Sequence, residues 1–275
     1  MAVSSKAWDE LKILPEEDRL WEVFHENSKL SRLDAHPPNS ESRKEMLNLW
    51  TSLPFVGYPA VPLPQERATF QMGLGEAIEN RVTARRIEPS SVRLDELAAI
   101  LHAAYGETRS NDSGEFPRPF RTTPSAGALY PLEIFMHTKN VESIGPGVYH
   151  FNPSQRCLRR IIEGDMSRQL AEALLFSNVP YDASIVFFLT AIFERSTFKY
   201  GERGYRFALL EAGHVAQNIN LAATGLGMGV INIGGYFDRE VDRFLGIDGV
   251  RHATVYLIAI GRLLDAGTGV ATEDA

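Results

Sequence analysis

Cysteine is almost absent from this chain of 275 residues. The one cysteine, Cys157, cannot form an intramolecular disulfide or build a cysteine-based metal cluster, so we expect a small apolar side chain that is buried or half-buried. A surplus of positive charge is lacking as well, because 28 Lys and Arg stand against 35 Asp and Glu and give a net charge of -7. Nucleic-acid-binding proteins usually gather a basic surplus on one face, so we expect no nucleic-acid partner.

Long apolar runs are also missing. The longest run, residues 185–193, is far shorter than the ~20 residues that a helix needs to cross a bilayer. The first residues carry Glu10, Glu16, Glu17 and Asp18 and no continuous apolar stretch, which is unlike a secretory signal. We therefore expect a cytoplasmic protein without a membrane partner.

The composition changes along the chain and predicts three regions. Residues 1–70 are acidic and then rich in proline, which favours an N-terminal arm wrapped on a neighbouring body. Residues 71–264 alternate between helix and strand patterns, and residues 265–275 are small and polar, which predicts a flexible C-terminal tail. This alternation predicts an α/β fold, or an α+β sandwich, around a buried sheet. Helices are expected at residues 21–30, 94–104, 167–176 and 205–224, strands at 132–137, 147–151, 184–192, 230–233 and 254–260, and a loop at 107–120.

The expected helix at residues 205–224 carries small or apolar side chains almost all the way round. Such a helix is buried in a large core or in an oligomer interface. Glu211, His214 and either Gln217 or Asn218 form one polar stripe along it, and buried polar groups need partners. A satisfied core network and a ligand contact are both open for this stripe.

Two Glu-x-x-His pairs have the spacing found in di-iron helical bundles: Glu22 with His25, and Glu211 with His214. Those bundles need four long helices that also supply two further carboxylates. Strand patterns occur throughout this chain instead, so we expect no metal site.

Three turns rich in small residues could let the backbone approach a flat or anionic ligand. They lie at residues 124–128, 225–229 and 233–236. An ordinary helix end explains the second turn well and the other two less well. The glycine patterns of dinucleotide-binding folds and of P-loops are absent, which excludes those two classes of nucleotide site.

A basic cluster at residues 81–86 lies upstream of these turns and contains Arg81, Thr83 and Arg85. A guanidinium group beside a hydroxyl suits phosphate, because its fork donates to two oxygens at once. By itself such a cluster is more often a solvated face. Together with the glycine turns it favours a mononucleotide cofactor.

Lys199 and Tyr200 lie in a polar segment, residues 198–206, between an expected strand and the long helix. A lysine or tyrosine side chain acts as a general base near neutral pH only where burial or a nearby cation lowers its pKa. Arg195, Arg203 and Arg206 could supply that cation. The alternative is a charged loop that caps the helix.

These motifs occur together, in this order, in one family. The chain resembles the SagB-type azoline dehydrogenases, the FMN-dependent branch of the nitroreductase superfamily, from about residue 76 to residue 264, with a weaker likeness at residues 24–29. The runs TPSAGALYP at residues 123–131 and KYGERGYR at residues 199–206 carry the resemblance, supported by EAGH at 211–214 and by the two glycines at 234–235.

The resemblance implies a nitroreductase-like FMN-binding fold in which two subunits pack through long helices and each flavin lies at the interface. The family element that grips the flavin phosphate and ribityl chain matches residues 81–85, although Val82 replaces an arginine and Thr83 a serine. Lys199 and Tyr200 match the pair proposed as the catalytic base in azoline dehydrogenases. The FMN contacts that the resemblance implies are Arg81, Thr83, Arg85, Ser125, Gly127, Gln217, Gly234, Gly235 and Arg262.

The implied activity is the oxidation of thiazolines or oxazolines to thiazoles or oxazoles in peptide natural-product biosynthesis. A hydride passes to flavin N5 and a proton to the base. The implied partners are a second copy of the chain, a peptide or carrier-bound heterocycle and other biosynthetic enzymes. Two alternatives remain open, an NAD(P)H-dependent nitro- or flavin reductase and a flavin-binding scaffold of a biosynthetic complex.

Overall fold

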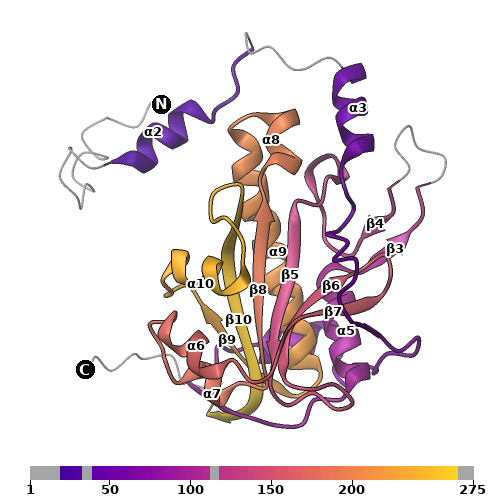
Figure 1. Cartoon of the computed structure of the whole chain (residues 1–275), viewed down its shortest axis with the longest axis vertical. Helices are drawn as coiled ribbons and strands as arrows, with labels where there is room; N and C mark the ends of the chain where they lie inside the picture. Colours follow the sequence, from indigo (N-terminus) through magenta and orange to yellow (C-terminus); the bar gives the residue numbers. More distant parts are fainter. Residues whose placement is uncertain (1–18, 33–38, 112–117, 266–275) are drawn as a thin grey trace.

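A computed structural model describes residues 19–32, 39–111 and 118–265. A central antiparallel sheet runs in the order β1-β7-β6-β5-β8-β10-β2, and β9 also pairs with β10 (Figure 1). Its strands are β1 (Ala60–Pro62), β2 (Arg86–Glu88), β5 (Leu132–Thr138), β6 (Gly147–Asn152), β7 (Cys157–Glu163), β8 (Ile185–Ile192), β9 (Met228–Ile233) and β10 (His252–Asp265). A separate hairpin pairs β3 (Glu107–Arg109) with β4 (Phe120–Arg121).

Helices cover both faces of the sheet (Figure 1). They are α2 (Leu20–Asn27), α3 (Asn39–Asn48), α4 (Leu74–Asn80), α5 (Leu94–Tyr105), α6 (Ser167–Glu172), α7 (Val179–Asp182), α8 (Glu194–Tyr200), α9 (Arg203–Gly225) and α10 (Asp238–Leu245), with a short 3-10 turn, η2 (Ala126–Ala128). No helix among these is long and apolar enough to cross a membrane.

The side chains of β8 alternate between two cores because successive strand residues point to opposite faces. Phe187 and Leu189 pack with α5 and α9 in one core, whereas Val186 and Phe188 pack with α6, α7 and α10 in the other. This arrangement confirms the predicted class in its α+β form, a sandwich around a buried sheet.

All five predicted strands are present, and β10 extends well beyond its predicted bounds. The strand β7 escaped prediction because its arginines, Arg159 and Arg160, interrupt the apolar pattern. Cys157 is buried at the start of β7, as expected, and burial raises the pKa of its thiol.

One predicted helix has the wrong bounds, and one helix was not predicted. The helix expected at residues 167–176 ends at Glu172, and a second short helix, α7, follows it. Residues 194–200 form the helix α8, which the sequence pattern did not predict, and Gly201 ends it with a positive φ of 53°. Glycine adopts this conformation without steric cost, which is why it commonly terminates helices. The hairpin β3–β4 occupies both ends of the expected loop at residues 107–120, and residues 112–117 lie outside the described part of the chain.

The helix α9 is confirmed at its predicted position, but it is not buried all the way round. Most of its small side chains face the sheet, and Ala216 is 3% exposed in the chain's own core. Leu209 and Leu210 are 41% and 61% exposed, and His214 and Gln217 are exposed on the same side. We call these four residues the open face of α9.

Candidate functional site

Lys199 and Tyr200 lie at the C-terminal turn of α8 and reach the turn that precedes β5. A Cβ atom placed on Gly127 of that turn would lie 2.6 Å from the Tyr200 hydroxyl and 3.1 Å from Lys199 Nζ. The Lys199 amine lies 5.4 Å from the centre of the Tyr200 ring, which packs edge-on against Phe207. The two side chains therefore converge on one spot of backbone that only glycine leaves open.

The turn itself has an unusual backbone. Gly127, Ala128 and Tyr130 have positive φ values of 63°, 53° and 49°. Left-handed conformations cost energy for residues other than glycine and persist only where the surroundings fix them. Here the Ser125 hydroxyl accepts a hydrogen bond of 2.9 Å from the Tyr130 amide, and the Tyr130 hydroxyl accepts one of 2.9 Å from the Arg121 amide. The turn is thus held in place by its own side chains.

Glu211 of α9 lies buried behind this turn and is 3% exposed. Tyr105 donates a hydrogen bond to it, and Ser125 makes a second contact. Burial raises the pKa of Glu211 to about 7, although both hydrogen bonds and the charge of Arg121 act in the opposite direction. Glu211 and Asn218, which bonds the Ala103 carbonyl at 2.9 Å, are the part of the predicted polar stripe that belongs to a core network.

We expect the raised pKa of Glu211 to lower stability as the pH rises. The folded chain holds this proton better than the unfolded chain, so the free energy of unfolding falls between pH values near 4.5 and 7, by about 3 kcal/mol in all. The variant Glu211→Gln has no carboxyl to ionise. Urea titrations of both proteins at about pH 5 and about pH 8 measure the free energy of unfolding. Relative to the parent, the variant should be more stable at the higher pH than at the lower pH. If the difference in the free energy of unfolding between the two proteins did not change with pH, Glu211 would not titrate in this range.

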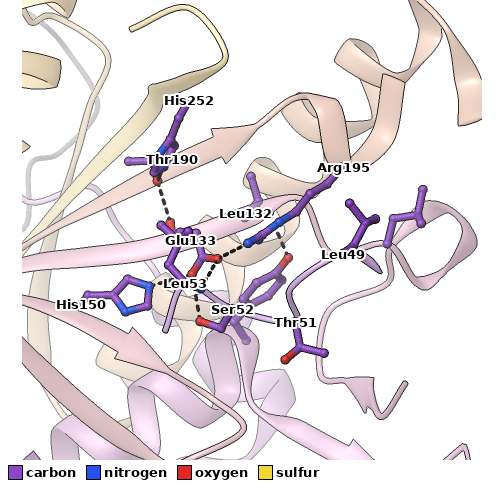
Figure 2. A network of polar contacts seen from close by, with 12 residues as sticks. Leu49, Thr51, Ser52, Leu53, Leu132, Glu133, His150, Thr190, Arg195 and His252 are labelled. Atoms are coloured by element: carbon purple, nitrogen blue, oxygen red, sulfur yellow. Dashed lines mark hydrogen bonds and ion pairs between the residues drawn. The ribbon is translucent and has the colours of Figure 1, made fainter. Parts of the chain in front are cut away.

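A second buried carboxylate, Glu133 of β5, joins several elements (Figure 2). It accepts hydrogen bonds from Arg195 Nη2 at 2.7 Å, His150 Nε2 at 2.6 Å, Ser52 Oγ at 3.0 Å and the Leu53 amide at 2.9 Å. Burial alone would raise the pKa of Glu133, but the charge of Arg195 and the bond from His150 outweigh it and hold the pKa well below its usual range. Glu133 therefore ties α8, β6 and the arm to the middle of the sheet.

His252 lies beside this cluster, with its Nε2 2.8 Å from Thr190 Oγ1 (Figure 2). Burial lowers the pKa of His252 to about 4. The ring is therefore neutral at physiological pH and acts as a packed, hydrogen-bonded side chain.

Two of the three cations proposed to lie beside Lys199 are placed differently from the sequence-based prediction. Arg195 is 3% exposed and pairs with Glu133. Arg206 donates to the His25 carbonyl and stacks on Phe24 of α2. These two guanidinium groups anchor α8 and the arm through these contacts.

The basic cluster lies along the outer edge of β9. Thr83 forms a parallel bridge with Val230, and the Ala84 amide donates to the Val230 carbonyl at 2.8 Å. Thr83 and Arg85 are exposed, and Arg81 is half-buried. Arg262 of β10 is 63% exposed at its side chain and pairs with Glu88. We call Arg81, Thr83, Arg85 and Arg262 the arginine edge.

Gly234 and Gly235 follow β9 directly. A Cβ atom on Gly234 would meet nothing within 4 Å, so the backbone there faces open space. A Cβ atom on Gly235 would lie 2.9 Å from the end of the Leu175 side chain, and the Gly235 carbonyl accepts from the Leu175 amide at 3.1 Å.

The register of the sheet separates the arginine edge from Lys199 and Tyr200. Thr83 is level with Val230, which pairs with Ile260, which pairs with Ile185 at the start of β8. The helix α8 follows the far end of β8 (Figure 1). The eight residues of β8 span about 23 Å at about 3.3 Å per residue. One chain therefore carries the two groups of predicted site residues at opposite ends of a strand.

Sequence reasoning missed the residues that support the lysine. Glu133 is the single carboxylate in a buried and mostly apolar strand, and such a residue must find a buried partner, so this signal was available. Arg118 and Arg121 gave no comparable signal, because they lie in or next to a polar segment that contains Pro117 and Pro119. Both are buried, and the pKa of Arg118 falls to about 10 through burial and the neighbouring charges of Arg195 and Arg121.

Comparison with known families and sequences gives a consistent result. The profile described as Nitroreductase family matches residues 78–262. A protein of Methanocaldococcus jannaschii named as a nitroreductase, MJ1384, is 36% identical over 195 residues, which cover 71% of this chain and 93% of that protein. The microcin B17-processing protein McbC of Escherichia coli is 34% identical over 198 residues, which cover 66% of this chain and 63% of McbC.

Solved structures show the same fold. The E. coli microcin synthetase McbBCD complex with truncated pro-MccB17 bound contains a chain that aligns with a TM-score of 0.57 and 22% identity, covering 96% of this chain and 99% of that one. A Desulfovibrio desulfuricans structure, described as a nitroreductase in complex with FMN, aligns with a TM-score of 0.50 and 17% identity, covering 74% and 92%.

Proposed function

The chain belongs to the nitroreductase family, and we propose that it is an FMN-dependent dehydrogenase that aromatises thiazoline or oxazoline rings in peptide natural-product biosynthesis. One observation carries the proposal: Lys199 and Tyr200, far from Gly127 in the sequence, converge on its backbone. This arrangement offers a hydroxyl and an amine to one substrate atom.

The residues of the arginine edge fit the cofactor. Guanidinium groups and a threonine hydroxyl are donors that suit a phosphate, and the open backbone at Gly234 allows a flat ring to approach closely. We assign Arg81, Thr83, Arg85 and Arg262 to the phosphate and ribityl chain, and Gly234 and Gly235 to the ring. Arg262 would have to share its guanidinium group with Glu88.

Aromatising an azoline removes one hydride and one proton from adjacent ring carbons and leaves a new carbon–carbon double bond in the ring. FMN, when bound, supplies the acceptor for the hydride. Lys199 and Tyr200 take the proton, since their polar atoms meet at Gly127. Ser125 keeps the turn beneath them in place, and Glu133 holds α8 through Arg195.

A second copy of the chain would bring the two groups of residues together. In a homodimer, the arginine edge, Gly234 and Gly235 of one protomer would face Ser125, Gly127, Lys199 and Tyr200 of its partner. The open face of α9 is the surface that such a dimer would bury, and it includes the proposed flavin contact Gln217. An apolar groove of about 370 Å³ between α4, α5 and α9 continues this face.

The likeness to McbC supports a peptide substrate, and the McbBCD structure supports other biosynthetic enzymes as partners. The match to MJ1384 favours a second candidate, a nitro- or flavin reductase driven by NADH or NADPH. Anaerobic addition of NADH or NADPH distinguishes the two activities. Rapid bleaching of the flavin absorbance would favour the reductase, and bleaching by an azoline peptide would favour the dehydrogenase.

We expect the purified protein to be a yellow homodimer that holds one noncovalent FMN per protomer. Leu210→Glu places a charge on the open face of α9 and should yield a monomer with weakened FMN binding, because an unpaired charge in an interface is costly. Val250→Glu, at a loop position that is 78% exposed, is the control and should behave as the parent. Ala216 is unsuitable for this test because it lies in the chain's own core.

Light scattering with absorbance detection measures mass and flavin content together. A colourless protein that takes up no FMN on titration would refute the proposed function. A stable monomer with FMN bound would refute the shared site.

A further inference from the structure

We propose that the N-terminal arm completes the substrate site, and that Met46 is a positioning residue for the Lys199 amine. The arm segment Met46–Leu53, called the strap below, lies outside residues 78–262, which the family profile matches. The inference rests on the proposed function only in naming Lys199 as the base.

The contact between the strap and the lysine is direct. Met46 Sδ lies 4.0 Å from Lys199 Nζ, and Met46 is 8% exposed although it lies at the end of a surface helix. No carboxylate in the described part of the chain is within ion-pair distance of Lys199. The thioether, the Tyr200 ring and Gly127 are therefore the neighbours of the amine.

The backbone of the strap is fixed to the body of the protein by buried arginines. Arg118 donates to the carbonyl groups of Met46, at 3.2 Å, and of Leu49. Arg121 donates to the carbonyl of Thr51 at 2.5 Å. Hydrogen bonds between charged groups and their partners are stronger than neutral ones. Because these bonds use backbone carbonyls, a change of the Met46 side chain leaves them in place.

The end of the strap and the lysine-bearing helix share one anchor. Ser52 and the Leu53 amide donate to Glu133, which also pairs with Arg195 (Figure 2). Lys199 lies one helical turn beyond Arg195 on α8, and residues four apart share a helix face. The carboxylate of Glu133 therefore fixes the position of Met46 relative to Lys199, since the strap and α8 are both bonded to it.

The test compares Met46→Ala with Leu47→Ala, its neighbour on the arm, which is 59% exposed and serves as the matched control. Acetic anhydride labels the lysines of the FMN-loaded protein, and peptide mass spectrometry gives the labelling rate of Lys199 relative to Lys139. Lys139, whose amine bonds the Tyr181 carbonyl at 2.8 Å, is the internal reference. We expect a several-fold rise of this ratio in Met46→Ala, none in Leu47→Ala, and a return toward the parent ratio in the volume-conserving Met46→Leu.

Turnover of an azoline peptide is the second readout. Misplacing a reacting group by about 1 Å can cost about 10²-fold in rate, so we expect Met46→Ala to lose about 10- to 10²-fold in kcat with little change in KM. An unchanged labelling ratio in Met46→Ala, or labelling rates that rise equally at Lys199 and Lys139, would overturn the placement of Met46. A raised ratio with an unchanged kcat would overturn its role in the reaction. If the parent protein does not turn over azolines, the proposed function fails, and the labelling ratio alone decides whether Met46 positions the amine.

Discussion

Lys199→Ala and Tyr200→Phe are each expected to lower azoline turnover by about 10²- to 10⁴-fold, the range typical of a lost general base. Both side chains meet at Gly127, at the opposite end of β8 from the arginine edge within the same chain. FMN binding should stay close to that of the parent protein, because the proposed flavin contacts are other residues, the arginine edge among them. Steady-state kinetics and flavin absorbance, measured on the same preparations, check the two halves of this expectation.

Arg85→Ala is the matched control because it alters the proposed phosphate contact and leaves α8 untouched. It should lose FMN first and activity as a consequence. Parent-like turnover in both Lys199→Ala and Tyr200→Phe would show that the base lies elsewhere. His214 would then be the next residue to test, although it lies exposed on the open face of α9.

Glu133→Ala is expected to lower the free energy of unfolding by about 3–5 kcal/mol, the cost of breaking a buried ion pair by removing one partner. The change leaves the buried charge of Arg195 without its carboxylate and removes the acceptor of His150, Ser52 and the Leu53 amide. Total stabilities of about 5–15 kcal/mol are usual, so the loss would be a large fraction of the whole. Denaturant unfolding measures it.

Glu172→Ala provides the comparison for a surface pair. Glu172 lies 3.7 Å from Arg168, both side chains are largely exposed, and removal should cost less than about 1 kcal/mol. The depressed pKa of Glu133 also makes the effect depend on pH. The ionised carboxylate contributes to the free energy of unfolding above the usual pKa of a glutamate, and this contribution is lost as the pH falls. The difference in the free energy of unfolding between the parent and Glu133→Ala should therefore become smaller at acidic pH. If Glu133→Ala and Glu172→Ala lost the same free energy of unfolding, the role assigned to the Glu133 cluster would be contradicted.

The strands that sequence reasoning found are those whose apolar residues face two cores. Residues of β5 and β8 are buried on both sides of the sheet, so their apolar runs are long and easy to recognise. The strand β7, which lies between the edge strand β1 and β6, carries arginines, and α8 carries polar residues on a helix of seven residues. Such short or mixed segments take their structure from their neighbours, which a local pattern does not reveal.

The candidate site was predictable in its parts and not in its assembly. Motif order singled out Lys199, Tyr200 and Gly127, and the structure brings these three together. The separation of the arginine edge from them depends on strand register, which pairs residues far apart in the chain. The strap escaped notice for another reason: Arg118 holds it through backbone carbonyls, which every residue possesses.

The strand β10 has a consequence for how the chain matures in the cell. It pairs with β8, with β9 and with β2, whose Glu88 meets Arg262 across a very long stretch of sequence. During synthesis, β2 and β8 emerge from the ribosome well before β10, and non-local pairings of this kind form slowly. Until residues 252–265 have been made, the apolar edge of β8 remains available to other nascent chains. We therefore expect ribosomes stalled before His252 to carry a chain that chaperones bind and proteases cut, and chains extended past Asp265 to become resistant.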